Sequence, residues 1–476
     1  MTTDPTPDFK TDLVIGLEIH VELDTHTKLF CSCSTENTEE PNMHTCPVCL
    51  GHPGSKPVLN KEAVEYAIRL CLALGCTINR KLIFSRKSYF YPDMAKNYQI
   101  TQYEIPIGTG GKLRISDSKE VGLERAHLEE DPASLVHVGD MATSPFVLVD
   151  YNRSGRPLIE IVTKPEMHSA AEARDFMKKL ITVLNYIGIF DQENCIIKAD
   201  ANVSIKESGY VRSEVKNITG FKEIERALKY EIDRQRKEVS EGKKMIQDTR
   251  AWDSAKGITT LLRTKETEED YGYILDPDLV VTEITDDWVE DVKKDMPELA
   301  QDKVSKFVDK YKIDKIDAEV LAEERLLAEM FEKVAKKVDP VLAAKWMRRE
   351  LMRVVNYNNK NFEDLEIDET HMIELLEMIE KKEITENVAK KIIEKLMEEP
   401  FSPREYVKGL GLRVISDASE LEDVCKSAID ENPKAVEEFK AGNEKSLHFL
   451  IGQVMKKTKG QAAPAEVHKL MKKLIK

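Results

Sequence analysis

One apolar segment near the start of the chain carries polar side chains at alternate positions. It reads Val14-Ile-Gly-Leu-Glu-Ile-His-Val-Glu-Leu23. Successive side chains of a β-strand point to opposite faces, so Glu18, His20 and Glu22 would emerge together while their apolar neighbours face a core. A carboxylate in an apolar sheet is costly unless it is paired or bound to a cation. The segment therefore predicts a strand with a polar site on one face.

Two later apolar segments each contain a single carboxylate. Glu160 interrupts Pro157-Leu-Ile-Glu-Ile-Val162, and Asp200 interrupts Ala199-Asp-Ala-Asn-Val-Ser204. Oxygen ligands contributed by several strands are typical of a divalent-cation site, most often a site for Mg²⁺. We therefore expect these strands to converge on one cation.

The segment His127-Leu-Glu-Glu-Asp131 adds a dense group of acidic residues. Taken alone, Glu129 or Glu130 would more often be an exposed loop residue, but converging strands would place them beside the other carboxylates. Arginine and lysine are concentrated at 86–99 and 150–156. Cationic donors beside a divalent cation suit the phosphates of a nucleoside triphosphate. The sequence has no Walker motif and no Gly-rich kinase loop, so nucleotide binding would use a less common architecture.

Four of the eight cysteines form two close pairs, Cys31-Ser-Cys33 and Cys46-Pro-Val-Cys49, which are separated by twelve residues. Two such pairs on a polar loop can close a tetrahedral site of four thiolates, the arrangement that structural zinc prefers. The zinc would organise residues 31–49 and leave no open position for catalysis. The alternative, four free buried thiols, is disfavoured by this spacing. Clustered cysteines of this kind fit a reducing compartment better than a disulfide framework.

The chain has 476 residues, of which 41% are hydrophobic and 33% charged, and its formal net charge is −15. This length predicts two to four domains. No apolar run approaches the ~20 residues that span a bilayer, and the N-terminus lacks a secretory pattern, so we expect a cytoplasmic protein without a membrane partner. The net charge disfavours indiscriminate nucleic-acid binding. The last thirty residues nevertheless hold seven lysines and one glutamate, which indicates either a phosphate-binding surface or exposed helix ends.

The pattern of the chain changes from mixed to helical near residue 290. Before that point, strand patterns alternate with three predicted helices, namely one between Asn60 and Gly75, one between Ser169 and Gly188, and one from Phe221 to about Glu241. After it, Lys-, Glu- and Leu-rich helical patterns follow one another. We therefore expect an α+β fold, with a mixed-sheet domain at 1–290, a helical connector at 291–340 and a helical tail domain at 341–476.

Together these features resemble the GatB family, the B subunits of aspartyl/glutamyl-tRNA(Asn/Gln) amidotransferases. The resemblance covers nearly the full chain through blocks in the same order, which is far more specific than one motif. The blocks are VIGLEIHVEL at 14–23, LFCSC and CPVCLGHPG within 29–54, RKSYFYPDMAKNYQITQ at 86–102, HLEED at 127–131, VDYNRSGRPLIEIV at 149–162, DANVSI at 200–205, LRTKETEEDYGYILDPDL at 262–279 and GQVMKKTKGQAAPAEVHKLM at 452–471.

The resemblance implies a carbon–nitrogen ligase that takes its nitrogen from glutamine, built on a glutamine-synthetase-like cradle followed by helical and tail domains. In this family the B subunit uses ATP to phosphorylate the side-chain carboxylate of Asp on tRNA(Asn) or Glu on tRNA(Gln). Ammonia released by the glutaminase, which is the A subunit, then displaces the phosphate. A small linker protein, the C subunit, completes the heterotrimer. The implied cofactors are ATP, Mg²⁺ and a structural Zn²⁺.

The resemblance also implies roles for individual residues. It assigns catalysis and Mg²⁺ to Glu18, His20, Glu130 and Glu160, with Asp200 as an additional Mg²⁺ ligand. Glu130 would also stand at the exit of an ammonia tunnel. The tail would contact the outer corner of the tRNA through Lys456, Lys457 and Lys459. Our own candidates for the ATP phosphates or the tRNA end are Arg86, Lys87, Arg153 and Arg156.

The chain departs from the family pattern at two places and leaves two alternative functions open. Pro132-Ala-Ser134 follows HLEED where the family commonly has Ala-Gly-Lys, and Lys198-Ala199 replaces Arg-Cys.

A zinc-stabilised tRNA-binding scaffold without catalysis would explain the cysteines and the basic end, but not the carboxylates on apolar strands. A ligase acting on a free amino acid would explain the carboxylates, but not the basic end.

Overall fold

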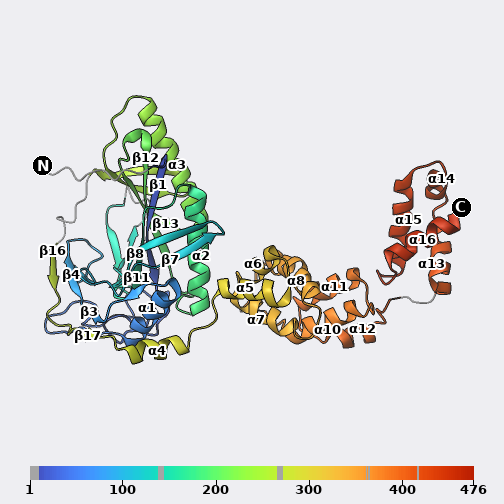
Figure 1. Ribbon diagram of the computed structural model, residues 1–476, viewed down its shortest axis with the longest axis horizontal. Coiled ribbons are helices and arrows are strands. Elements are labelled where there is room, and N and C mark those ends of the chain that lie inside the picture. The colour runs from blue at the N-terminus through green and yellow to red at the C-terminus, as the bar shows by residue number, and fades with distance from the viewer. Residues whose placement is uncertain are drawn as a thin grey trace. The chain divides into compact units, whose positions relative to one another are not determined.

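The computed structural model describes residues 10–137, 144–264, 272–360, 362, 365–414 and 418–475. The chain divides after Leu299 into two compact units. The first is rich in strands and the second is helical, which confirms the expected α+β class (Figure 1). None of the described helices is long and apolar enough to cross a membrane.

One large sheet forms the framework of the first unit. Among the described residues it contains 13 strands, and neighbouring strands along its main path run antiparallel except for one parallel pair, β13 and β14. Along that path the strands are β15 (Ile258–Thr264), β14 (Asp248–Asp253), β13 (Ser213–Thr219), β12 (Ile197–Ile205), β1 (Leu13–Glu22), β11 (Pro157–Thr163), β8 (Lys119–Glu130), β5 (Tyr98–Thr101), β4 (Ser85–Ser88) and β16 (Gly272–Leu275). Three more strands pair at its side, β2 (Thr77–Ile78), β6 (Gly108–Thr109) and β7 (Lys112–Ser116).

Strand β1 lies inside this path, between β11 and β12, and coincides with the predicted strand to within one residue at each end. Its register places His20 opposite Glu160 of β11 and Glu18 opposite Asp200 of β12. The opposite face of β1 is buried in the main hydrophobic core through Ile15, Leu17, Ile19 and Val21. The period-two pattern therefore separates the polar and apolar faces of β1 as predicted.

The three helices expected in this unit are present, and two of them have the predicted caps. The Asn60 side chain accepts from backbone N–H groups at the start of α1 (Lys61–Leu74), which ends at Gly75 with φ of 68°. Ser169 caps α2 (Ala170–Ile187) in the same way, and α3 spans Phe221–Ser240. A positive φ at a helix end favours glycine because it has no Cβ. Helices α2 and α3 contact each other and lie beside the sheet, while α1 contacts α4 (Asp286–Lys294) (Figure 1).

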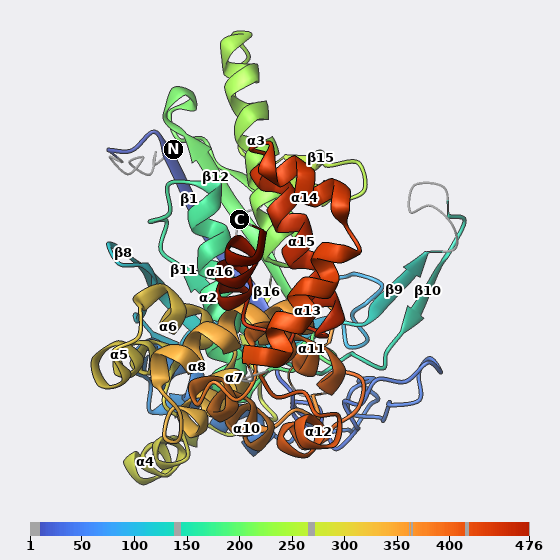
Figure 2. The same ribbon diagram turned by 90° about the vertical axis from the view of Figure 1, so that its right-hand side faces the viewer.

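Two small ribbons stand outside the large sheet. Strands β9 (Ser134–His137) and β10 (Val147–Asp150) pair with each other and project from the body of the unit (Figure 2). Strands β3 (Lys81–Leu82) and β17 (Thr282–Glu283) form the second ribbon. A short 3₁₀ helix, Lys206–Ser208, follows β12.

The helical unit contains two separate hydrophobic cores among its described residues. The first core includes side chains from Phe307 to Val407, and the second includes side chains from Leu421 to Ile475. Side chains from Phe307 to Val338, within the expected connector at 291–340, belong to the first core together with those of later helices. The helices around the first core are α5 (Ala300–Tyr311), α6 (Lys315–Leu321), α7 (Arg325–Val334), α8 (Pro340–Trp346), α9 (Met352–Tyr357), α10 (Glu369–Glu380), α11 (Glu386–Leu396) and α12 (Pro403–Gly409), with a π-helical turn at Met347–Leu351. Those around the second core are α13 (Ala418–Asp430), α14 (Pro433–Lys440), α15 (Glu444–Lys457) and α16 (Pro464–Ile475).

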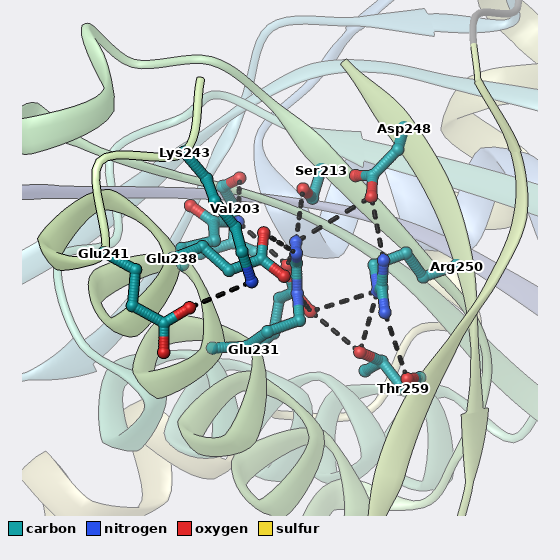
Figure 3. A network of polar contacts seen from close by, with 11 residues as sticks. Val203, Ser213, Glu231, Glu238, Glu241, Lys243, Asp248, Arg250 and Thr259 are labelled. Atoms are coloured by element: carbon teal, nitrogen blue, oxygen red, sulfur yellow. Dashed lines mark hydrogen bonds and ion pairs between the residues drawn. The ribbon is translucent and has the colours of Figure 1, made fainter. Parts of the chain in front are cut away.

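A buried ionic network attaches α3 to the outer strands β14 and β15. Glu231 of α3 is completely buried, and Thr259 of β15 donates to it at 2.9 Å (Figure 3). Arg234 donates to the same carboxylate at 2.9 Å, and Arg250 of β14 lies 3.5 Å from it. Arg250 also donates to Asp248 at 3.0 Å. Because each charge in this group has a partner, the burial of Glu231 is tolerated.

The network generates a stability prediction. Glu231→Ala leaves the Arg234 and Arg250 guanidinium groups without their shared carboxylate, so it should lower the free energy of unfolding of the sheet-rich unit by about 3–5 kcal/mol. Thermal and urea unfolding of the full chain measure the change. Glu225→Ala is the matched control, because this partly exposed residue of α3 holds only surface partners, Arg174 and Lys229. Equal loss in both variants would contradict a special role for the buried network.

Candidate functional site

Three adjacent strands carry a row of polar side chains across the sheet. In their registers His20 of β1 lies opposite Glu160 of β11, and Glu160 lies opposite His127 of β8. Directly opposed residues of antiparallel strands share a face. Glu129 follows His127 by two residues and Glu18 precedes His20 by two, so both lie on this face as well. We name Glu18, His20, His127, Glu129 and Glu160 the acidic cluster.

The members of the acidic cluster lie close together. The distance from His20 Nε2 to the nearest carboxylate oxygen is 3.4 Å for Glu160, 3.6 Å for Glu129 and 3.8 Å for Glu18. His127 Nε2 lies 3.5 Å from Glu160 and 3.7 Å from Glu129. Glu129, Glu160 and His127 are buried, whereas Glu18 and His20 are partly exposed. The cluster therefore opens to solvent at its β1 side.

The electrostatics of this cluster favour a positive charge at its centre. Burial opposes protonation of His20, yet its hydrogen bond to Glu160 and the neighbouring carboxylates raise its pKa to about 10. Burial and then the repulsion from Glu160 raise the pKa of Glu18 to about 7. Although burial acts against it, the two imidazoles hold the pKa of Glu160 below its usual range. Three carboxylates this close require cations between them.

The donor set of the cluster fits a divalent cation. One ligand atom each from Glu18, His20 and Glu160 lie within 4.8 Å of one another, and the same holds for His127, Glu129 and Glu160. Glu160 belongs to both groups, so the two groups of potential ligands share one carboxylate. Carboxylate oxygens are the preferred protein ligands of Mg²⁺, and one imidazole beside them is compatible with other divalent ions as well.

A cavity of about 330 Å³ adjoins the acidic cluster. Its lining includes Glu18, Glu129 and Glu160, and three cationic residues, namely Lys87, Arg125 and Arg212. The Arg125 guanidinium lies 3.3 Å from Glu160. Arg212 is exposed and has no ion pair or hydrogen bond among the described residues. Carboxylates and guanidinium groups on the walls of one cavity suit a metal-bound polyphosphate.

The structure does not bring Glu130 into the acidic cluster, contrary to our expectation. Glu130 follows Glu129 on β8, so its side chain projects from the opposite face of the strand. Its carboxylate is buried there against Lys96 Nζ at 2.5 and 2.6 Å and accepts the backbone N–H of Ile100 at 2.8 Å. A carboxylate already satisfied by an ammonium on another face is a poor candidate for the shared cation.

Asp200 lies at the border of the cluster. It is opposite Glu18 in the register of β1 and β12. Its carboxylate accepts from Lys216 Nζ at 2.9 Å and from the backbone N–H of Asn217 at 3.1 Å. Asp200 therefore contributes negative charge beside Glu18 while its own oxygens already have donors.

Of our four candidate phosphate ligands, only Lys87 lines the cavity. The Arg86 guanidinium is bound by Asp276 at 2.8 Å and Asp278 at 3.1 Å and lies over the ring of Tyr98. The other two arginines are engaged in a separate buried group, in which Arg153 contacts Glu22 and Asp131, and Arg156 contacts Glu22. Glu22 thus shares a strand with Glu18 and His20 but serves a different ionic group.

The four cysteines of residues 31–49 come together as predicted. Their sulfur atoms lie within 4.8 Å of one another, which fits a Zn²⁺ ion held by four thiolates. The hydrogen bond from Cys31 lowers the pKa of Cys49 to about 4. Burial of the thiol acts in the opposite direction, and the positive charge of Lys28 acts in the same direction. Lys28 is completely buried and donates to the carbonyls of His44 at 2.6 Å and Tyr151 at 3.2 Å. Lys28 thereby links the cysteine loop to Tyr151.

The basic end of the chain belongs to the helices that surround the second core of the helical unit. Lys456 and Lys457 end α15, and Lys459 follows with φ of 53°. All three are exposed. Lys457 Nζ donates to Ser427 at 2.6 Å and also pairs with Glu431.

Comparison with known proteins identifies the family. A family model described as the GatB/GatE catalytic domain matches residues 13–290, and one described as the GatB domain matches residues 329–475. The chain belongs to the GatB family. It is 43% identical to the B subunit of the aspartyl/glutamyl-tRNA(Asn/Gln) amidotransferase of Carboxydothermus hydrogenoformans, over 97% of this chain and 98% of the relative. The B subunits of the same name from Thermodesulfovibrio yellowstonii, at 43% identity over 98% and 99%, and from Clostridium botulinum strain Langeland, at 42% over 97% and 98%, are similar relatives. The resemblance to GatB seen in the sequence is confirmed.

Several residues of this GatB-family site escaped the sequence analysis. Glu129 and Glu130 are consecutive acidic residues, and only the folded position of β8 decides which of them faces the acidic cluster. His127 belonged to a recognised block without a role. Arg125 and Arg212 lie in strands or strand ends that show no motif, so only the folded cavity singles them out.

The cysteine cluster generates a metal prediction. Protein purified without chelator should contain about one zinc per chain by metal analysis, because four thiolates complete a tetrahedral site. Cys46→Ser removes one ligand and should release most of the metal. Cys425→Ser is the matched control, since that buried cysteine lies in the second helical core and should leave the zinc content unchanged. Zinc-free wild-type protein would overturn the assignment.

Proposed function

We propose that this chain is the phosphorylating subunit of a glutamine-dependent tRNA amidotransferase that acts in the cytoplasm. It converts Asp on tRNA(Asn), Glu on tRNA(Gln), or both, to the amide in an ATP-dependent reaction. The observation that carries the proposal is the cavity in which the acidic cluster meets Lys87, Arg125 and Arg212. A scaffold that only bound tRNA would have no use for this buried concentration of charge, and membership of the GatB family disfavours that alternative.

The chemistry begins with the side-chain carboxylate of the misacylated amino acid. A carboxylate is a poor electrophile, because an amine cannot expel oxide from it. Its oxygen therefore attacks the γ-phosphorus of ATP, ADP leaves, and an acyl phosphate forms. Ammonia then attacks the acyl carbon, inorganic phosphate leaves with the C–O electron pair, and loss of a proton gives the amide. The nucleophilic carboxylate is already anionic, so this first step needs no general base.

The acidic cluster is the proposed holder of the divalent cation. Glu18, His20, Glu129 and Glu160 would hold Mg²⁺, which would reduce the negative charge of the phosphates. His20 would do so as neutral imidazole, since a protonated ring has no lone pair to give. Arg125, Arg212 and Lys87 neutralise the remaining charge of the phosphates from the other walls of the cavity. Asp200 supports the site from β12 by binding the Lys216 ammonium, whose charge acts on the Glu18 carboxylate.

Glu130 is proposed for the ammonia side of the reaction. It lies on the opposite face of β8 from Glu129. Strand β8 would therefore present Glu129 to the phosphoryl site and Glu130 to the incoming ammonia. A buried carboxylate paired with Lys96 can accept a proton from ammonium or from the attacking amine. Two consecutive residues would thus have separate roles, Glu129 in phosphorylation and Glu130 in amination.

The partners follow from the family. We propose the glutaminase and the small linker protein, the A and C subunits of such a complex, as partners, with the sheet-rich unit acting as a glutamine-synthetase-like cradle. Support for the cradle is the large sheet whose strands contribute to the walls of one cavity. Lys456, Lys457 and Lys459 are proposed contacts to tRNA phosphates, and their exposure supports this role.

A reconstitution assay tests the function. It combines this chain with both partner proteins, ATP, glutamine and each misacylated tRNA in turn. We expect amide formation that depends on ATP. No such amide formation by a well-folded complex would reject the proposal, and turnover of free aspartate or glutamate would favour the free-amino-acid ligase.

Two variants should separate the proposed steps. Glu160→Ala removes the carboxylate shared by both parts of the acidic cluster, so phosphorylation and amidation should both fall by at least about 10²-fold, as expected when a positioned charge is lost from a transition state. Glu130→Gln should retain ATP cleavage dependent on misacylated tRNA while amide formation is lost. ADP release and amide release are measured in parallel for both variants and for wild type. The affinity of each variant for tRNA should remain unchanged. Loss of ADP release in Glu130→Gln would place this residue in the phosphoryl site instead.

Arg212 generates a second kinetic prediction. Loss of a charge-assisted hydrogen bond costs about 1.5–3 kcal/mol, so Arg212→Ala should raise KM for ATP by about 10-fold or more. Steady-state amidation by the reconstituted complex measures this change. Arg236→Ala is the matched control, because that half-exposed arginine lies on α3 and does not line the cavity. An unchanged KM in Arg212→Ala would remove this residue from the phosphate-binding set.

A further inference from the structure

A close contact joins the cysteine loop to the buried pair of Lys96 and Glu130. Gly51 follows Cys49 by two residues and has φ of 68°. A Cβ atom built on Gly51 would lie 3.2 Å from both the Cα and the Cβ atom of Lys96, and closer still to its Cγ. Non-bonded carbon atoms normally keep about 3.5–4.0 Å between them. The Lys96 side chain therefore occupies the space that a side chain at position 51 would need.

The other member of the pair also adjoins this loop, through a second glycine. A Cβ atom built on Gly155 would lie 3.7 Å from Cys49 Cβ and 3.8 Å from Glu130 Oε2. The Gly155 N–H donates to the carbonyl of Asp131, which follows Glu130, at 2.8 Å. The Gly155 carbonyl accepts the N–H of Leu29, shortly before the first cysteine, at 2.9 Å. The loop thus contacts one member of the pair directly and the other through a single glycine.

The place of Gly51 is set by the cysteine pair before it. The N–H of Leu50 donates to the carbonyl of Cys46 at 3.0 Å, and the N–H of Gly51 donates to the carbonyl of Val48 at 3.1 Å. These hydrogen bonds form one turn that contains two of the four clustered thiols. The segment that holds these thiols therefore also holds Gly51 against Lys96.

A shift of Lys96 would act directly on the Glu130 carboxylate. The two side chains are only 10% and 6% exposed, so water compensates little for a lost contact. The Lys96 ammonium contacts both carboxylate oxygens, at 2.5 and 2.6 Å. A side chain at position 51 would meet the base of the Lys96 side chain and not its flexible end. It would therefore displace the whole side chain and weaken a buried ion pair that depends on its geometry.

We propose that Gly51 is a positioning residue for amination, because it leaves the room in which the cysteine loop holds the Lys96 ammonium on Glu130. This inference rests on the proposed role of Glu130 on the ammonia side of the reaction. The four cysteines are not among the residues that line the cavity of the acidic cluster. The cysteine loop thus affects the use of ammonia and not the transfer of the phosphoryl group.

The test compares two neighbouring glycines in the reconstituted complex. Gly51→Ala places a Cβ atom against Lys96. Gly54→Ala is the matched control, because Gly54 also has a positive φ, 84°, but a Cβ atom there would meet nothing within 4 Å. Both variants carry the strain of alanine at positive φ, and only Gly51→Ala displaces Lys96. ADP release, amide release and zinc content are measured for each variant, alone and combined with Lys96→Ala.

We expect Gly51→Ala to lower amide release about 10-fold or more, as misplacement of a group near the reacting atoms does, while ADP release and zinc content stay at wild-type values. Gly54→Ala should release amide at the wild-type rate. When it is combined with Lys96→Ala, Gly51→Ala should cause no further loss of amide release, because its effect passes through Lys96.

Wild-type amide release by Gly51→Ala, equal losses in the two glycine variants, or a further loss in the Lys96→Ala background would overturn the proposal. If thermal unfolding shows that Gly51→Ala does not fold, Gly51→Asn replaces it, because asparagine tolerates a positive φ and still carries a Cβ atom. Loss of ADP release in Lys96→Ala would instead reject the proposed role of Glu130. Wild-type complex that forms no amide would reject the proposed function, so the failures are distinguishable.

Discussion

Mutual neutralisation of buried charges at the acidic cluster is the constraint on which the sheet-rich unit depends. Three carboxylates and two imidazoles share one face of β1, β8 and β11, with heavy-atom distances of 3.4 to 3.8 Å between them. Burial opposes protonation of His20, yet the neighbouring carboxylates raise its pKa to about 10. The apolar sheet therefore tolerates these groups because opposite charges lie next to each other.

The acidic cluster lies where several strands meet. Residues on the same face of one strand lie about 7 Å apart, and neighbouring strands lie about 4.8 Å apart, so long side chains can meet both along a strand and across strands. His20 meets Glu18 along β1 at 3.8 Å and Glu160 across strands at 3.4 Å. The registers that oppose His20 to Glu160 and Glu160 to His127 bring the acidic cluster together. The core on the other face of β1 fixes those registers, because a slip would bury the charges.

The sequence alone predicted the parts of this site that depend on local periodicity. The alternation in β1 identified Glu18 and His20, the lone carboxylate identified Glu160, and the cysteine spacing identified the four thiols. Choices that depend on register between strands could not be made, which is why Glu129 was not separated from Glu130. Arg125 and Arg212 come from segments that only tertiary folding brings together. Helix ends were predictable because Asn60, Ser169 and their terminal glycines act within one turn of chain.

The opposed faces of β8 also restrict how the protein can change over evolution. Insertion of one residue just before Glu129 would move Glu129 to the face where Glu130 pairs with Lys96, so the acidic cluster would lose that carboxylate. The described residues of the ribbon of β9 and β10, which begins at Ser134, do not line the cavity. Homologous chains should therefore vary in length in that ribbon, while the spacing from His127 to Glu130 stays invariant.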